Sequence, residues 1–163
     1  MPRRAPSRAA GERTRYSSGT VWERAVGYSR AVRVGTHVYV SGTTATGPDG
    51  RIVAPDDAYR QALQVLDNIE RGLEALGSER AAIVRLRIFV KEIADFPAIV
   101  RALGPRFRDI RPAATLVEVS GFVDPAMRLE VEAEAEDLPA RPTARAARRP
   151  ERRHRAPVRR RPS

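Results

Sequence analysis

Apolar and polar side chains alternate over residues 30–42, which is the pattern of a strand with one buried face. The alternation is interrupted at Gly35-Thr36, a turn signal between two apolar runs. The alternating residues are Val32 and Val34 before the turn and Val38 and Val40 after it. The sequence therefore predicts a β-hairpin in this region.

Apolar spacing of three and four residues follows the hairpin and predicts a helix from about Asp57 to Leu76, with Gly77 as its stop signal. Its apolar positions are Ala62, Leu66, Ile69, Leu73 and Leu76. A second helix is expected from Asp95 to Phe107, with Gly104-Pro105 as a potential early end.

Alternation returns in three further runs, which predict strands over Ile83 to Lys91, Ala114 to Phe122 and Met127 to Glu136. Together with the hairpin and the two helices, these runs give the element order β-β-α-β-α-β-β. The body of the chain is therefore predicted to be a single α+β domain.

The last predicted strand places four carboxylates on one sheet face. They belong to Glu130, Glu132, Glu134 and Glu136. One interpretation is a solvated face, because runs of charge are usually exposed. The other places one or two of these glutamates at a subunit interface or pocket, paired with cations or backbone donors.

The two ends of the chain carry its net charge of +10. Residues 141–163 hold ten arginines against Glu151, and residues 1–15 hold five against Glu12, so the body between them is slightly acidic. Both ends lack large apolar side chains, and we expect residues 1–15 to form a disordered basic extension and 139–163 a disordered Arg/Pro-rich tail. Non-specific contact with nucleic acid is expected to involve 141–163.

Composition also limits the location and chemistry of the protein. No apolar run is long enough to cross a bilayer and no signal peptide is apparent, so a cytoplasmic location without membrane contact is expected. The chain has no cysteine and only two histidines, which excludes thiol chemistry and argues against a histidine-built metal site.

Eight short motifs then occur in an order that resembles the RidA (YjgF-type) family, and they span most of residues 16–138. They are Gly27-Tyr28-Ser29-Arg30-Ala31, Tyr39-Val40-Ser41-Gly42, Gln64-Val65-Leu66-Asp67-Asn68-Ile69, Arg87-Ile88-Phe89-Val90, Asp95-Phe96, Arg111-Pro112-Ala113, Val117-Glu118-Val119 and Leu129-Glu130-Val131-Glu132-Ala133. The resemblance implies a chorismate-mutase-like fold, a mixed sheet backed by two helices. It also implies a homotrimeric barrel with a small-molecule pocket in each interface, which would cover part of the glutamate face.

Active members of that family are cofactor-free hydrolases that deaminate reactive imines and enamines to 2-oxo acids and ammonia. In the family that the chain resembles, the arginine that binds the substrate carboxylate follows a Pro-Ala pair. The corresponding position here is Ala114. A glutamine common after Ser-Gly is replaced by Thr43, and an asparagine by an apolar residue near Val100. These departures argue against ordinary 2-imino acid deaminase activity.

The residues that the resemblance still assigns to a pocket are Tyr28, Arg30, Ser41, Gly42, Thr43, Ala114 and Glu130. Glu130 is the catalytic candidate, as the group that orients water. Arg30, Arg87 and Arg128 are candidates for a substitute cation, although solvent-facing positions are the more common expectation for strand arginines. Trp22 is interpreted as an anchor for the N-terminal strand.

Three functions remain open at this point. The first is a Rid-type trimer that binds or processes a small metabolite other than a simple 2-imino acid, with an imine deaminase using a substitute arginine as its variant. The second is an RNA-associated protein that acts through its basic ends, since the body has no histidine pair for nuclease chemistry. The third is a purely structural or holdase-like trimer.

Overall fold

The computed structural model describes residues 12–138. Most of the predicted basic extension and the whole predicted Arg/Pro-rich tail, with its expected nucleic-acid contacts, lie outside the described residues. In the described part, no helix is both long and apolar enough to cross a membrane.

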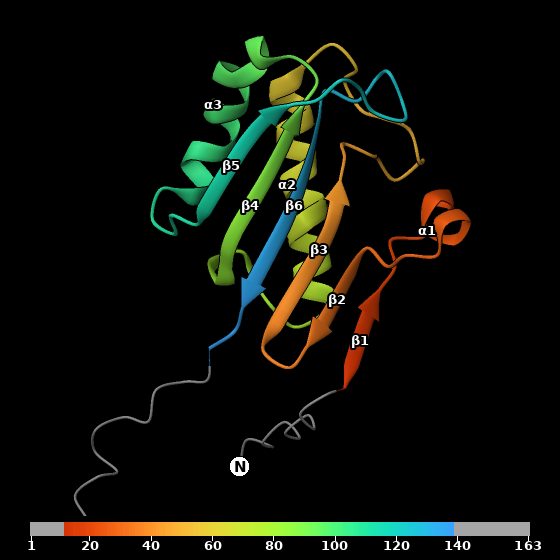
Figure 1. The fold of residues 1–163 in the computed structure, drawn as a ribbon, viewed down its shortest axis with the longest axis vertical. Coiled ribbons are helices and arrows are strands. Elements are labelled where there is room, and N and C mark those ends of the chain that lie inside the picture. Colours follow the sequence, from red (N-terminus) through yellow and green to blue (C-terminus); the bar gives the residue numbers. More distant parts are fainter. Residues whose placement is uncertain (1–11, 139–163) are drawn as a thin grey trace, which may run out of the picture.

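One six-stranded sheet runs through the molecule in the order β1-β2-β3-β6-β4-β5 (Figure 1). The strands are β1 (Arg13–Tyr16), β2 (Ala31–Val34), β3 (His37–Thr43), β4 (Ile83–Val90), β5 (Ala113–Glu118) and β6 (Leu129–Glu136). The β4–β5 pair is parallel and all the other neighbours are antiparallel, so the sheet is mixed, as predicted. The parallel pair follows from the helical crossover between these two strands.

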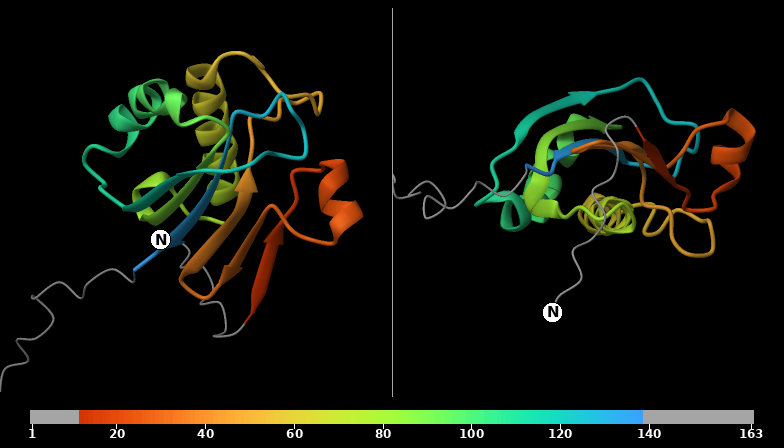
Figure 2. Two further views of the ribbon diagram at one scale, coloured as in Figure 1. Left: turned by 45° about the horizontal axis from the view of Figure 1, so that its top comes forward. Right: turned by 90° about the horizontal axis from the view of Figure 1, so that it is seen from below.

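Two helices, α2 (Ala58–Ala75) and α3 (Phe96–Phe107), cover one face of the sheet (Figure 2). Asp57 caps α2 by accepting a hydrogen bond from the backbone N–H of Arg60 at 3.0 Å. Gly77 follows α2 with φ +72°, a left-handed conformation that suits glycine. Short 3-10 helices, η1 (Arg80–Ala82) and η2 (Ile93–Asp95), precede β4 and α3.

The core lies between these helices and the sheet, and the predicted periodicities mark it correctly. Leu66, Ile69 and Leu73 of α2 are at most 1% exposed. Across from them, β6 contributes Leu129, Val131, Ala133 and Ala135, while its glutamates lie on the opposite face. Burial of these apolar side chains is the main force that holds the helices to the sheet.

Two N-terminal elements differ from the sequence prediction. Strand β1 includes Arg13 to Arg15, which were expected in the disordered extension, and helix α1 (Val21–Val26) was not predicted. Pairing with β2 orders β1, although its sequence RTRY carries a single large apolar side chain. Because the order comes from backbone hydrogen bonds to a neighbour, hydrophobic periodicity could not indicate it.

The predicted end of helix α3 at Phe107 is confirmed, and two strand boundaries are corrected. Helix α3 continues through Gly104-Pro105 to Phe107, because Pro105 lies near the helix end and Gly104 has no Cβ to clash with the proline ring. Strand β5 ends at Glu118 instead of Phe122, and β6 begins at Leu129 instead of Met127.

The glutamate face of β6 is paired with cations along most of its length. Arg87 of β4 donates to Glu132 at 3.1 Å and forms an ion pair with Glu134 at 2.9 Å, and His37 lies 3.6 Å from Glu136. Glu130 is the exception: within residues 12–138 it has no hydrogen-bond or ion-pair partner. The sheet face therefore carries an ion-pair ladder that stops short of Glu130.

Candidate functional site

A β-bulge in β3 shapes the candidate site. Val40 pairs with Ala133 and Thr43 pairs with Val131, so β3 has one residue more than β6 between these two points. Such a bulge bends the strand and redirects the residues within it, here Ser41 and Gly42. The Ser41 hydroxyl donates to the Ser29 carbonyl at 2.8 Å, which ties the bulge to the segment before β2.

Glu130 lies directly over Gly42. A Cβ atom at residue 42 would come 1.7 Å from Glu130 Oε1 and 2.8 Å from its Cδ. Only glycine therefore leaves room for the carboxyl group in this position.

A cavity of about 400 Å³, which we name the Glu130 cavity, opens over this point. It is lined by Thr20, Trp22, Val26, Tyr28, Arg30, Ser41, Gly42, Thr44, Thr46, Val123, Met127 and Glu130. Its volume falls within the range of small-molecule pockets, roughly 300 to 1,000 Å³. Five of the seven predicted pocket residues meet here, namely Tyr28, Arg30, Ser41, Gly42 and Glu130.

Burial raises the pKa of the Glu130 carboxyl above its ordinary value. The charge of Arg30 opposes this effect, and the neighbouring Glu132 carboxylate adds to it. A carboxyl group with a raised pKa, facing a cavity and free of partners within the described chain, can accept a proton or bind a cationic donor.

Arg30 has a different position from the one expected of a strand arginine. It is 8% exposed, and its guanidinium donates to the Gly42 carbonyl, to Thr43 Oγ1 at 3.3 Å and to the Tyr28 hydroxyl at 2.9 Å. Its Nε lies 3.6 Å from Glu23 Oε1. The solvent-facing expectation for Arg30 is therefore wrong, and the side chain is largely bound by the protein itself.

Glu23 anchors this arginine from helix α1 and was missed in the sequence. It is 4% exposed and accepts hydrogen bonds from Ser17, Ser18 and Thr20. Burial would raise the pKa of its carboxyl, but the hydrogen bonds from Ser17 and Ser18, together with the charge of Arg30, lower it overall. Nothing in the spacing of residues 17–30 distinguishes this buried acid from an exposed one.

The other wall of the Glu130 cavity is apolar. Met127 is buried, whereas Trp22, Val26 and Val123 are 47%, 73% and 77% exposed. Trp22 lies at the cavity as part of α1, so it does not merely anchor β1. An apolar wall beside one carboxyl group suits a ligand with a hydrocarbon part and a nitrogen donor.

Thr43 and Ala114 lie outside the Glu130 cavity. Thr43 is 2% exposed, and its hydroxyl binds Arg30 and donates to the Ser41 carbonyl at 2.7 Å. Ala114 of β5 pairs with Leu86, whose side chain faces the helices, whereas Glu130 pairs with Phe89. Since Leu86 and Phe89 are three residues apart on β4, Ala114 and Glu130 lie on opposite faces of the sheet.

Ala114 lines an apolar groove between β5 and α3, which we name the Ala114 groove. Val100, Phe107, Arg108 and Arg111 also line it. Both arginines are exposed, and Arg111 has φ +52°. Arg87 is half-buried and belongs to the ion-pair ladder. Arg128 binds Asp95 through two hydrogen bonds, at 2.8 and 2.9 Å. Neither Arg87 nor Arg128 lines the Glu130 cavity or the Ala114 groove.

Among residues 12–138, no group of three or more histidine or carboxylate side chains is placed to hold a metal ion.

Known proteins are similar to this chain in sequence and in fold. A model of the endoribonuclease L-PSP family matches residues 20–137. An uncharacterized protein of Streptomyces coelicolor is 33% identical over 121 residues, which cover 74% of this chain and 90% of the relative. A 2-iminobutanoate/2-iminopropanoate deaminase of Dermatophagoides farinae is 31% identical over 105 residues, covering 64% of this chain and 81% of the relative.

Among solved structures, the chain is similar to Rv2704 from Mycobacterium tuberculosis, described as a member of the YjgF/YER057c/UK114 family. The TM-score is 0.71 at 39% identity, and the match covers 77% of this chain and 100% of that one. The predicted RidA (YjgF-type) resemblance and the mixed α+β fold are thereby confirmed. The chain belongs to the endoribonuclease L-PSP family, the family of the YjgF-type proteins.

Proposed function

We propose that the chain is a Rid-type homotrimer that binds a small amine- or imine-bearing metabolite, and that it is not an ordinary 2-imino acid deaminase. The observation that carries this proposal is the Glu130 carboxyl, which faces a cavity and has no partner within residues 12–138. Its natural counterpart is a nitrogen donor on a ligand.

The same cavity offers little to a substrate carboxylate. Its one basic side chain, Arg30, already binds the Gly42 carbonyl, Thr43 and Tyr28 and lies beside Glu23. A guanidinium held in this way has few donors left for a bidentate contact. Carboxylates are therefore expected to bind poorly.

Assembly would complete the site. Ala114 and Glu130 lie on opposite faces of the sheet, so one chain cannot bring the two positions into one pocket. A trimer would allow the Ala114 groove of one subunit to face the Glu130 cavity of the next. We expect light scattering to give a mass three times the 18.0 kDa of the chain.

In a bound imine, Glu130 would orient a water molecule toward the imine carbon. Addition of this water and loss of the nitrogen as ammonia converts the C=N bond to C=O. Where the ligand is a stable amine, the same residue would act only by binding.

The intrinsic fluorescence of Trp22 gives a direct test, because it is the sole tryptophan in the chain and lines the Glu130 cavity. Titration with butylamine should change the emission and saturate, whereas butyrate, an acid of similar length, should not. The Glu130→Gln variant should lose at least about tenfold in amine affinity, the size of one charge-assisted hydrogen bond. Tighter binding of butyrate than of butylamine would contradict the proposal.

A deaminase with a substitute arginine is the second candidate. Arg108 and Arg111 are exposed and line the same groove as Ala114, and a relative bears the name 2-iminobutanoate/2-iminopropanoate deaminase. In this case Arg111→Gln should lower the rate of 2-imino acid hydrolysis at least about tenfold. Arg60→Gln, an exposed arginine elsewhere on the helical face, is the matched control.

A further inference from the structure

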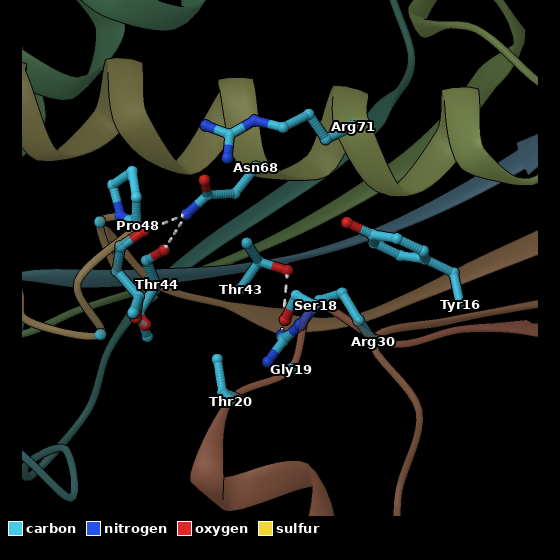
Figure 3. Close-up of a pocket in the computed structure, with 13 residues that line it drawn as sticks. Tyr16, Ser18, Gly19, Thr20, Arg30, Thr43, Thr44, Pro48, Asn68 and Arg71 are labelled. Carbon is cyan, nitrogen blue, oxygen red and sulfur yellow. Dashed lines mark hydrogen bonds between the residues drawn. The ribbon is translucent and has the colours of Figure 1, made fainter.

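A second cavity lies beneath α2, next to the Glu130 cavity, with which it shares Thr20, Arg30, Thr44 and Thr46. It is bordered by α2, the segment 16–20 and the loop 44–50, and is partly open to solvent (Figure 3). Its lining consists of Tyr16, Ser18, Gly19, Thr20, Arg30, Thr43, Thr44, Thr46, Gly47, Pro48, Gly50, Asn68 and Arg71. The volume is about 180 Å³, below the usual range for drug-sized ligands, so only a small ligand would fit.

The charge of this cavity is positive. Two of its lining residues, Arg30 and Arg71, are cations, and none is an aspartate or glutamate. Arg30 is partly neutralised by Glu23 at 3.6 Å. Arg71, by contrast, has no hydrogen-bond or ion-pair partner in the described part of the chain.

Uncommitted hydrogen-bond donors accompany this cation. The Tyr16 hydroxyl points into the space beneath α2 and has no partner among residues 12–138. The Arg71 side chain runs along α2 and also lines the cavity, with its guanidinium near Asn68 (Figure 3). The hydroxyls of Thr44 and Thr46 lie 3.0 Å apart, so one donates to the other and one proton remains for a ligand.

The loop that carries the threonines is fixed in place. Asn68 of α2 donates to the carbonyls of Thr44 and Thr46 at 2.9 and 3.0 Å, as the dashed lines in Figure 3 show. The Gly47 N–H donates to the Arg51 carbonyl at 2.8 Å. A wall held in this way needs little ordering when a ligand binds.

We propose that this cavity binds a small oxyanion, a phosphate or a carboxylate, with Arg71 as its principal ligand. The guanidinium supplies charge and paired donors, and the Tyr16 hydroxyl and one threonine hydroxyl add neutral donors. The site is separate from the Glu130 carboxyl, which lines the other cavity.

Thermal unfolding of the full chain at constant ionic strength and protein concentration tests this site, with inorganic phosphate, acetate and chloride as the added anions. The midpoint of the wild type should rise with phosphate or acetate in a saturable manner, because a ligand that binds the folded state stabilises it. The oxyanion that raises the unfolding midpoint more at the same concentration is the one that the site prefers. Chloride should give no saturable rise.

Variants localise the effect. Arg71→Gln should weaken the fitted oxyanion affinity at least about tenfold, and Tyr16→Phe should weaken it about threefold to tenfold. Arg60→Gln, also on α2 but outside the cavity, should leave it unchanged. The readout is the dependence on anion concentration, so a variant with a lower starting midpoint remains informative.

Three results would overturn the proposal: no oxyanion dependence in the wild type, an equal effect of chloride, or an oxyanion affinity in Arg71→Gln equal to that of Arg60→Gln.

Discussion

The Glu130 carboxyl occupies the space that a side chain at residue 42 would take, with Oε1 1.7 Å from the Cβ position of Gly42. Gly42 lies in the β-bulge of β3, and Glu130 lies near the start of β6. Their contact sets the position of the Glu130 carboxyl, the one carboxyl of the candidate site that has no partner within the described residues. Glycine at residue 42 is therefore a requirement of the site more than of the fold.

Gly42→Ala should consequently separate function from stability. The clashing atoms belong to the end of a flexible side chain, so the free energy of unfolding should change by less than about 1 kcal/mol. Displacement of the carboxyl should weaken amine binding at least about tenfold, as measured by Trp22 fluorescence. Gly121→Ala, where a Cβ meets nothing within 4 Å, should change neither quantity. A stable Gly42→Ala variant with normal amine affinity would show that Glu130 does not contact the ligand.

Glu130→Gln should alter the pH dependence of stability. The folded-state pKa of Glu130 is raised above its ordinary value of 4.5, so its contribution to stability is fully present below that value and is lost as pH rises through the folded-state pKa. Glutamine does not titrate, and the variant should therefore gain stability relative to wild type as pH rises above 4.5. Urea unfolding at matched protein concentrations measures this difference. A relative loss of stability over the same pH range would mean that the carboxylate has an unrecognised cationic partner.

Arg30→Gln should destabilise the folded chain by about 2 kcal/mol, because it removes charge-assisted hydrogen bonds to Gly42 and Tyr28 and leaves Glu23 buried without its cation. Arg24→Gln, an exposed arginine of α1, should change stability by no more than about 0.5 kcal/mol. Urea unfolding at one protein concentration compares the two. Equal effects of both substitutions would show that the buried network contributes little.

Contact with nucleic acid, if it occurs, should depend on the basic ends of the chain. Removal of residues 139–163 takes away ten arginines and should abolish binding to single-stranded RNA at 0.15 M salt, in a filter-retention assay. The full chain should lose binding steeply as salt increases. Salt-insensitive RNA binding by the truncated chain would place the interaction in the folded domain instead.

Local patterns in the sequence predicted most of the fold. Helix α2 and strands β2, β3, β4 and β6 follow from apolar spacing, because each buries one face in the core. Strand β1 and helix α1 escaped prediction, since β1 gains its order from backbone pairing with β2 and α1 spans only six residues.

The site was predicted in part, and only through the family resemblance. Tyr28, Ser41, Gly42 and Glu130 do share a cavity, but the burial of Arg30 depends on Glu23 and on a β-bulge, neither of which leaves a signature in residue spacing. The separation of Ala114 from Glu130 follows from strand register, which becomes visible only when β4 is placed between β5 and β6.

The central claim is that, with alanine at residue 114, the assembled site has no cationic side chain to bind a substrate carboxylate. The most direct measurement is the rate of hydrolysis of 2-iminobutanoate, generated in situ by a coupled enzyme, for the wild type, Ala114→Arg and Ala113→Arg. Ala113 is the matched control, because its side chain points to the other side of β5.

We predict slow hydrolysis by the wild type, an increase in kcat/KM of at least about tenfold for Ala114→Arg, and no increase for Ala113→Arg. Rapid hydrolysis by the wild type that Ala114→Arg does not improve would contradict the claim.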